Sequence, residues 1–194
     1  MPITDYTFQE ENSIDRIFYG RIRVVKSSSF LFFSENGITQ RLIHQLKYKN
    51  QEKIGLFFGN WYGQILQENQ FLKNIDYVIP VPLHAKKLKK RGYNQVALFA
   101  ERIAHYIQAT YADNILKKTA NTKTQTTKTR IGRWHDNKAL YTVTNTCDLK
   151  YKNVLLVDDV ITTGATMELC AQALSKIEGV NIFITSMATV SQFQ

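Results

Sequence analysis

Cysteine is scarce in this chain of 194 residues, which contains only Cys147 and Cys170. Two cysteines so far apart are too few for a zinc cluster or a disulfide framework. Long apolar runs are missing as well, so no segment approaches the length of a membrane span. The first 25 residues contain several acidic side chains and no apolar block, a pattern that disfavours a cleaved signal peptide. These absences predict a soluble, cytoplasmic protein.

Acidic residues are also few: 16 Asp and Glu stand against 25 Lys and Arg, which gives a formal net charge of +9. Such an excess favours polyanionic partners. Charge alone does not distinguish phosphate-bearing small molecules from nucleic acid or an anionic membrane surface. The four histidines are scattered without metal-ligand spacing, so the sequence predicts no metal held by protein side chains alone.

The first third of the chain predicts an extension to a larger core. Residues 1–15 are polar and patternless, which predicts a loosely held segment. Residues 21–33 are mostly β-branched, aromatic or small and precede the turn signal Asn36-Gly37, which favours a small β-hairpin. Apolar residues then recur at helical spacing over 38–48, and a second helix is expected over 54–66. We assign residues 1–70 to this N-terminal extension.

Residues 71–194 have the pattern of an α/β core. Short apolar runs at 77–79, 154–157 and 180–190 alternate with helical patterns at 94–107 and 164–177. Continuous apolar strands that alternate with helices predict a parallel sheet covered by helices. The expected fold class is therefore α/β, with a parallel sheet flanked by helices and a hairpin-and-helix extension.

The sharpest signal is the string V-L-L-V-D-D-V-I-T-T-G-A-T-M at residues 154–167. Its apolar strand brings Asp158 and Asp159 to the carboxyl end, where open α/β sheets bind their ligands. The next turn, residues 162–166, combines hydroxyls, free backbone N–H groups and a positive helix end, which suit a phosphate dianion. Gly164 allows the close backbone approach that such a turn needs. Because paired carboxylates repel phosphate, they favour sugar hydroxyls and hence a phosphorylated sugar.

A simpler alternative is an aspartate that caps a helix, with threonines that merely support the turn. The order of strand, acid pair, turn and helix over fourteen residues favours the sugar-phosphate interpretation. The string resembles the phosphoribosyl-pyrophosphate (PRPP) motif of type I phosphoribosyltransferases. That resemblance implies that Asp158 and Asp159 are the catalytic pair and bind the ribose 2′ and 3′ hydroxyls, and that one of the two acids stabilises an oxocarbenium-like sugar. It also implies magnesium, bound with PRPP, as the cofactor. The implied 5′-phosphate site consists of Thr162, Thr163, Gly164, Ala165 and Thr166.

Two further stretches resemble ComF proteins, a branch of that superfamily linked to DNA uptake in naturally competent bacteria. Residues 78–95 read V-I-P-V-P-L-H-A-K-K-L-K-K-R-G-Y-N-Q, and residues 41–48 read R-L-I-H-Q-L-K-Y like the family's first helix. The likeness spans about residues 30–190. It implies partners among competence or DNA-processing proteins.

The chain departs from these relatives at three points. ComF proteins usually begin with a four-cysteine zinc module, whereas residues 1–30 contain no cysteine, so that zinc site is not expected here. Asp136 stands where the family has an asparagine. In hypoxanthine-type relatives an aspartate three residues after the second acid contacts the purine. Thr162 occupies that place here, which argues against an ordinary 6-oxopurine salvage enzyme.

The leaving pyrophosphate would meet the loop formed by Val81, Pro82 and Leu83, although an ordinary proline-rich strand exit gives the same sequence. Residues 86–91 then place five cations in six positions. They form either a solvated face or a cationic wall beside the pyrophosphate. Arg91 is the best single candidate, because a guanidinium can bind two phosphate oxygens at once.

Residues 117–133 contain no acid and are rich in Thr, Lys and Arg, which predicts a flexible loop at about 117–138. It would close over the site and exclude water, unless it is a surface loop without a catalytic task. The loop residues singled out are Gln125, Arg130 and Arg133. The basic side chains would also suit single-stranded DNA, with Tyr93 and Trp134 available for base stacking.

Three functions fit these patterns. The first is a ComF-like phosphoribosyltransferase that binds magnesium-PRPP and transfers the phosphoribosyl group to a nitrogen nucleophile that the sequence does not specify. The second is a non-catalytic module of the competence machinery that senses PRPP and binds single-stranded DNA or a protein partner. The third is a regulator that binds PRPP without turning it over.

Overall fold

The structure is a computed structural model that describes residues 1–190 except residues 7, 120–139 and 145. Its central sheet has six strands in the order β1-β8-β7-β3-β4, with β2 also paired to β8, and all these strand pairings are parallel. The strands are β1 (Lys26–Ser27), β2 (Leu31–Phe33), β3 (Tyr77–Pro80), β4 (Thr110–Tyr111), β7 (Asn153–Ile161) and β8 (Asn181–Val190). A separate antiparallel pair is formed by β5 (Leu116–Lys118) and β6 (Tyr141–Val143).

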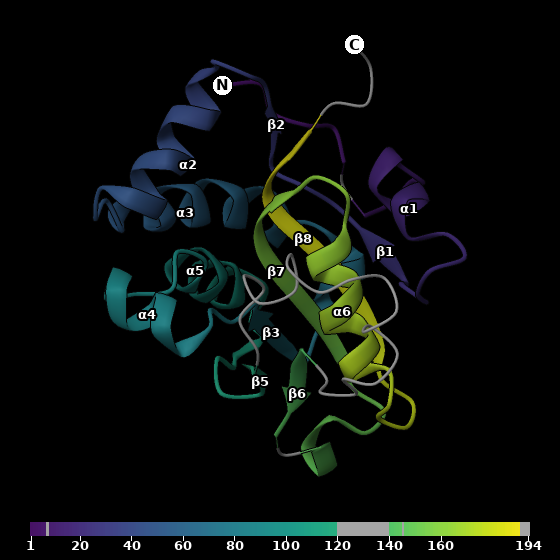
Figure 1. The fold of residues 1–194 in the computed structure, drawn as a ribbon. Helices are drawn as coiled ribbons and strands as arrows, with labels where there is room; N and C mark the ends of the chain where they lie inside the picture. The colour runs from purple at the N-terminus through teal and green to yellow at the C-terminus, as the bar shows by residue number, and fades with distance from the viewer. Residues whose placement is uncertain (7, 120–139, 145, 191–194) are drawn as a thin grey trace.

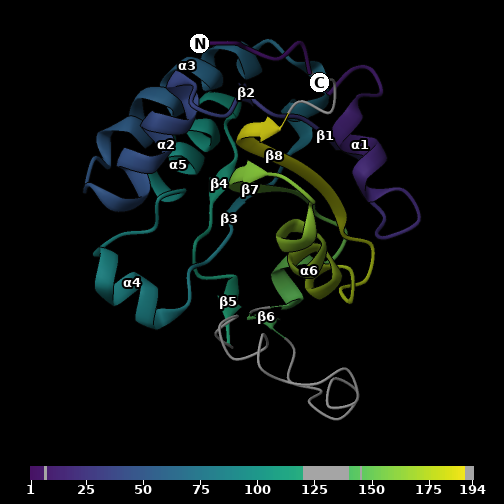
Figure 2. The ribbon, with the colours of Figure 1, turned by 45° about the horizontal axis from the view of Figure 1, so that its top comes forward.

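Helices cover both faces of the central sheet, so the predicted parallel α/β fold is confirmed (Figures 1 and 2). The helices α2, α3 and α5 lie on one face, and α6 lies on the other. The described helices are α1 (Ser13–Phe18), α2 (Ile38–Tyr48), α3 (Lys53–Gln67), α4 (Ala85–Arg91), α5 (Ala97–Ile107) and α6 (Ala165–Leu174), with 3₁₀ turns η1 (Gln70–Asn74) and η4 (Thr146–Leu149). The two helices expected over residues 38–48 and 54–66 are α2 and α3.

Alternation along β7 divides the apolar core into two layers. Leu155 and Val157 pack with side chains of α2, α3 and α5, whereas Val154 and Leu156 pack with side chains of α1 and α6. Successive strand residues point to opposite faces of a sheet. All four residues are fully buried, which explains why the strand reads as a continuous apolar run in the sequence.

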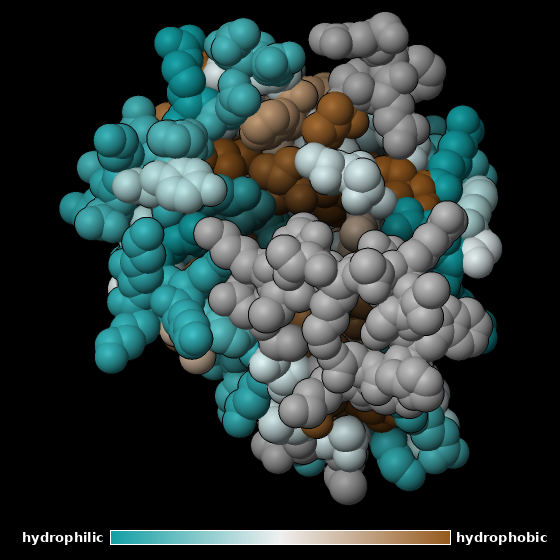
Figure 3. All heavy atoms as spheres, in the orientation of Figure 1, coloured by the Kyte–Doolittle hydropathy of each residue, from teal (hydrophilic) through white to brown (hydrophobic). Residues whose placement is uncertain are grey.

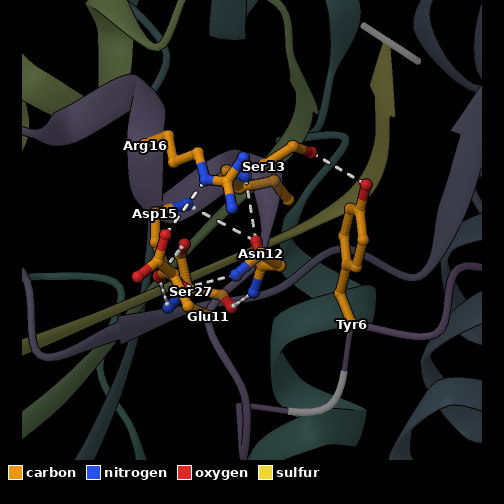
Figure 4. Close-up of polar contacts among 8 residues, drawn as sticks. Tyr6, Glu11, Asn12, Ser13, Asp15, Arg16 and Ser27 are labelled. Carbon is orange, nitrogen blue, oxygen red and sulfur yellow. Dashed lines mark hydrogen bonds and ion pairs between the residues drawn. The ribbon is translucent and has the colours of Figure 1, made fainter. Parts of the chain in front are cut away.

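The beginning of the chain is held firmly, contrary to the loose segment predicted for residues 1–15. Asn12 caps α1, and Asp15 in the first turn accepts hydrogen bonds from the Ser27 backbone N–H at 2.8 Å and from its hydroxyl at 2.6 Å (Figure 4). Phe8 and Ile14 are fully buried. The polar composition misled the prediction, because Asn12 and Asp15 are buried and bond to one another and to Ser27 of β1, although other polar residues such as Glu10 and Glu11 face water.

The β-hairpin predicted before Asn36-Gly37 is also wrong. β1 and β2 both pair with β8, in parallel, and the backbone between them continues along the same strand through Ser28 N–H to the Ile184 carbonyl (2.9 Å). The strand propensity was real, but the partner strand lies at the far end of the chain. Residues of the predicted extension and of the predicted core therefore share one sheet.

Two further boundaries differ from the prediction, and the basic run, whose local structure was not predicted, forms a helix. β7 does not stop at the acid pair but runs on to Ile161, because β8 continues beside it as far as Thr189. The basic run is helix α4, whose C-cap Gly92 adopts a left-handed conformation with φ of 88°. The predicted flexible loop begins too early, because Lys117 and Lys118 belong to β5.

Candidate functional site

The acid pair lies where one neighbouring strand ends. Pro80, the last residue of β3, is in register with Val157, and the Val81 N–H donates to the Val157 carbonyl at 2.8 Å. Asp158 is the next residue of β7 after this pair, so it lies level with the loop of residues 81–83, which leaves the end of β3. The structure thus brings the predicted pyrophosphate loop and the acid pair to the same edge of the sheet.

The two carboxylates point to opposite faces of the sheet. Asp159 reaches the side of α2 and α5, where it contacts Lys47 and Gln95. Asp158 lies on the side of α6, where it lines a small cavity together with the turn at residues 162–166. Both residues are largely buried, with 8% of Asp158 and 6% of Asp159 exposed.

Asp159 is held by two partners. Lys47 Nζ lies 2.7 Å from one carboxylate oxygen, and Gln95 Nε2 donates to the other at 2.6 Å. Gln95 accepts in turn from the Arg91 guanidinium. Lys47 and Gln95 belong to the two stretches that resemble ComF proteins, but their role as partners of Asp159 was not predicted. Both residues lie in motifs that the sequence shows, but their contact with Asp159 is seen only in the folded chain.

Asp158 has a different environment. Its Oδ1 accepts a hydrogen bond from the Asp159 N–H at 2.8 Å. Burial, followed by the nearby charge of Asp159, raises the pKa of Asp158 well above its ordinary value, and the weaker attraction of Lys47 and Lys118 does not offset this. A carboxyl with a raised pKa exchanges a proton more readily near neutral pH than an ordinary aspartate does.

Polar groups of β5, β6 and α6 lie near Asp158. Lys118 Nζ donates to the Tyr141 hydroxyl at 2.9 Å and lies 4.9 Å from the centre of that ring. Burial, and then the charge of Asp158, raises the pKa of the Cys170 thiol. Burial, and then the charge of Lys87, lowers the pKa of Lys118. Cys170 is fully buried, which agrees with its predicted role as a small core residue.

The predicted phosphate turn connects β7 to α6. Gly164 adopts φ of 74° and is the N-cap of α6, and no side chain caps this helix start. The first N–H groups of a helix lack partners within the helix and are directed outward from its end. Asp158 and residues 160–167 line a cavity of about 50 Å³ at this point. Thr162, Thr163 and Thr166 are exposed there.

Helix α1 and the residues that follow it pack against this turn. A Cβ atom on Gly164 would lie only 2.7 Å from Ile17 and 2.8 Å from Phe18 of α1. Arg21 donates to the Thr163 carbonyl at 2.8 Å and forms an ion pair with Glu168 of α6. Sequence reasoning missed Arg21 entirely, because no local pattern marks a contact between such distant segments.

The remaining predictions have mixed outcomes. Tyr93 is half-buried and its hydroxyl donates to the Leu46 carbonyl, so it is less available for base stacking than predicted. Gln125, Arg130, Arg133, Trp134 and Asp136 lie outside the described residues. In the part of the chain that the structure describes, no group of three or more His, Cys, Asp or Glu side chains could hold a metal ion. No helix among the described residues is both long and apolar enough to span a membrane.

Comparison with known families agrees with this geometry. The profile described as "Phosphoribosyl transferase domain" matches residues 94–189, which include Gln95, the acid pair and the turn at residues 162–166. Among solved structures, the allosteric regulatory enzyme of purine biosynthesis superposes with a TM-score of 0.50 and 17% identity, over 73% of this chain and 29% of that one. The fold and the site thus define a protein of the phosphoribosyltransferase fold.

Curated relatives narrow this class. Competence protein F of Haemophilus influenzae is 31% identical over 70% of this chain and 61% of its own length. Competence protein ComFC of Bacillus subtilis is 24% identical over 73% of this chain and 55% of its own length. The chain belongs to the ComF family of phosphoribosyltransferase-fold proteins. It spans only about three fifths of the length of the first of these relatives.

Proposed function

We propose that the chain binds magnesium-PRPP at the carboxyl end of β3, beside the acid pair of β7, and transfers its phosphoribosyl group to a nitrogen nucleophile. The observation that carries this proposal is the convergence of three features at one edge: the acid pair, the uncapped start of α6, and the loop that leaves β3. The 5′-phosphate would bind the hydroxyls and N–H groups of residues 162–166. The pyrophosphate would lie against residues 81–83, and the ribose would lie between them.

The reaction is a substitution at the anomeric carbon of the sugar. The nitrogen lone pair forms the new bond to carbon, the bond to the pyrophosphate oxygen breaks, and pyrophosphate leaves with that electron pair. The nitrogen then loses its proton. Positive charge develops on the sugar during this step, and the nearby carboxylates of Asp158 and Asp159 would stabilise it. The raised pKa of Asp158 means that this support strengthens as pH rises and the carboxyl ionises.

The donor set fits a magnesium ion that arrives with the substrate. Magnesium is commonly bound by one or two carboxylates together with substrate phosphates and waters. Asp158 supplies a carboxylate at the edge of the cavity, while Asp159 is engaged by Lys47 and Gln95. When bound, the ion would neutralise charge on the phosphates, and Asp158 is the described residue placed to hold it.

Binding can be tested by calorimetric titration of PRPP with magnesium. We expect binding to the wild-type chain and none to the double variant Asp158→Ala plus Asp159→Ala. Asp148→Ala is the matched control, because this exposed aspartate lies in η4, before the amino end of β7. Release of pyrophosphate with a panel of nucleobases then tests turnover. Equal affinity in the wild type and the double variant would refute the assigned site.

A second candidate function is the binding of single-stranded DNA. It is favoured by the exposed lysines of α4 and by the name of the Escherichia coli relative, "DNA utilization protein YhgH", which is 26% identical over 69% of this chain. Binding to phosphates releases counterions, so the affinity for DNA should fall steeply with salt. Titration of a labelled oligonucleotide at two salt concentrations tests this. DNA binding without pyrophosphate release would favour the non-catalytic module.

A further inference from the structure

A cationic cavity lies between α2 and α4, beside the acid pair, and shares Lys47 and Arg91 with the surroundings of Asp159. Its volume is about 520 Å³, which lies within the range of small-molecule sites. The lining side chains that matter are Lys47, Tyr48, Lys86, Lys87, Lys90 and Arg91. None of the described residues that line it is acidic. Over α2 and α4 the surface is mainly hydrophilic (Figure 3). Five cations around one hollow repel one another unless an anion lies between them.

An exposed aromatic ring forms part of the same cavity. Tyr48 is 65% exposed, the Arg91 guanidinium lies 5.8 Å from its ring centre, and the His44 ring lies 4.8 Å away. Bases stack on exposed aromatic rings, and phosphates bind beside them on Lys and Arg. A ring and a group of cations in one cavity match the two parts of a nucleotide.

The cavity is connected to the acid pair through two side chains. Lys47 lines it and also forms the ion pair with Asp159 at 2.7 Å. Arg91 lines it and donates to Gln95, which donates to Asp159 at 2.6 Å. A phosphate in the cavity would attract both cations away from these partners. The Oδ1 atom of Asp159, which faces Lys47, would then be free to accept a hydrogen bond from a sugar hydroxyl.

We propose that the cavity between α2 and α4 binds the phosphate and base of a nucleotide, and that its occupancy strengthens sugar binding at Asp159. The nucleotide site stands on the cavity alone, whereas the coupling rests on the proposed PRPP function. The sign of the coupling follows from the contacts. Withdrawal of Lys47 leaves a buried carboxylate unpaired, and a sugar diol at Asp159 compensates for that loss. By linkage, each ligand then raises the affinity for the other by the same factor.

The nucleotide site is tested first, with deoxythymidine 5′-monophosphate as the probe and no PRPP present. Loss of two charge-assisted hydrogen bonds in Lys86→Ala plus Lys90→Ala should weaken binding at least about tenfold. Lys89→Ala is the matched control, because it removes a charge from the same helix but does not line the cavity. A loss in Lys89→Ala as large as in the double variant would overturn the site, and so would equal binding of thymidine without phosphate.

The source of the nucleotide is tested by competition with oligothymidylate that carries or lacks a 5′-phosphate. Preference for the free monophosphate identifies a soluble nucleotide, and preference for the phosphorylated strand identifies a strand end. Equal competition by the two strands would show that the cavity reads backbone charge, which contradicts the proposal.

The coupling is tested by titrating PRPP and magnesium with and without saturating deoxythymidine monophosphate. The wild type should bind PRPP at least about fivefold more tightly with the nucleotide present, and Lys47→Met should show no such difference. An unchanged PRPP affinity in the wild type would refute the coupling. Failure of PRPP to bind at all would refute both the coupling and the proposed function, while the first experiment would still decide the nucleotide site.

Discussion

Asp158 and Asp159 are neighbours in the sequence, yet the sheet gives them opposite surroundings. On the face of α2 and α5, Asp159 has a lysine at 2.7 Å and an amide at 2.6 Å. On the face of α6, Asp158 accepts from a backbone N–H and is buried without an ion-pair partner within 4 Å among the described residues. One acid is a paired anion, and the other is a carboxyl with a raised pKa.

Two adjacent acids in a strand are therefore not one chemical unit. Alternation places the two side chains in separate layers of the protein, and each layer sets its own electrostatics. Asp159 forms an ion pair with Lys47, which also lines the basic cavity between α2 and α4. Asp158 lines a cavity together with the turn at residues 162–166 and the start of α6. Single substitutions on either face of the sheet test whether the two acids have different surroundings.

The largest effect is expected on the Asp158 face, from Gly164→Ala. The new side chain would combine left-handed backbone strain with a clash against Ile17 and Phe18, and should cost about 3 kcal/mol of unfolding free energy. Gly92→Ala is the control, because Gly92 also has a positive φ but nothing lies within 4 Å of the added atom. That control should lose only about 1 kcal/mol. Urea unfolding measures both, and equal losses would show that α1 does not press on the turn.

A smaller effect is expected on the Asp159 face, from Lys47→Met. Removal of the lysine leaves a buried carboxylate with only Gln95, which should cost about 2 kcal/mol because Lys47 itself is partly exposed. Lys152→Met removes a lysine from the more exposed pair with Asp76 and should cost less than about 1 kcal/mol. If urea unfolding finds the reverse order, the Lys47–Asp159 pair is not a buried interaction.

Measured per pH unit, the smallest effect is a pH dependence that distinguishes Asp158, whose pKa is raised, from Asp76, whose pKa is lowered. Because the pKa of Asp158 is raised in the folded state, its contribution to stability is present below its ordinary value near 3.8 and is lost as pH rises through the raised pKa. Asp158→Asn should therefore gain stability relative to wild type as pH rises, by at most about 1.4 kcal/mol per pH unit.

The matched comparison is Asp76→Asn. Burial alone would raise the pKa of Asp76, but hydrogen bonds from Lys152 and the Asn153 N–H lower it overall. Its contribution is therefore present above its ordinary pKa and lost as pH falls through the lowered one. Denaturant titrations from about pH 2.5 to 9 should show Asp158→Asn gaining stability relative to wild type as pH rises above about 4, and Asp76→Asn losing stability relative to wild type as pH rises toward about 4. Parallel curves would contradict the assigned environment of Asp158.

Much of the fold was predictable where the signal is local. The helical spacing of residues 38–48 predicted α2, and the apolar run before the acids predicted β7, because each pattern lies within one element. The N-terminal errors have a common cause. Residues 26–33 have strand propensity, but their partner β8 lies more than 150 residues away, and no local signal specifies such a pairing.

The order of strand, acid pair, glycine turn and helix follows from the amino-acid sequence alone, because backbone conformation and side-chain alternation are set by neighbouring residues. Which packed layer each acid enters, and which cation reaches it, depends on the three-dimensional packing of the whole chain. Lys47, Gln95 and Arg21 come from separate elements, and each reaches the site only after parallel strands and their helices have packed. Electrostatic interactions depend on distance in space, and the chain order does not contain that distance.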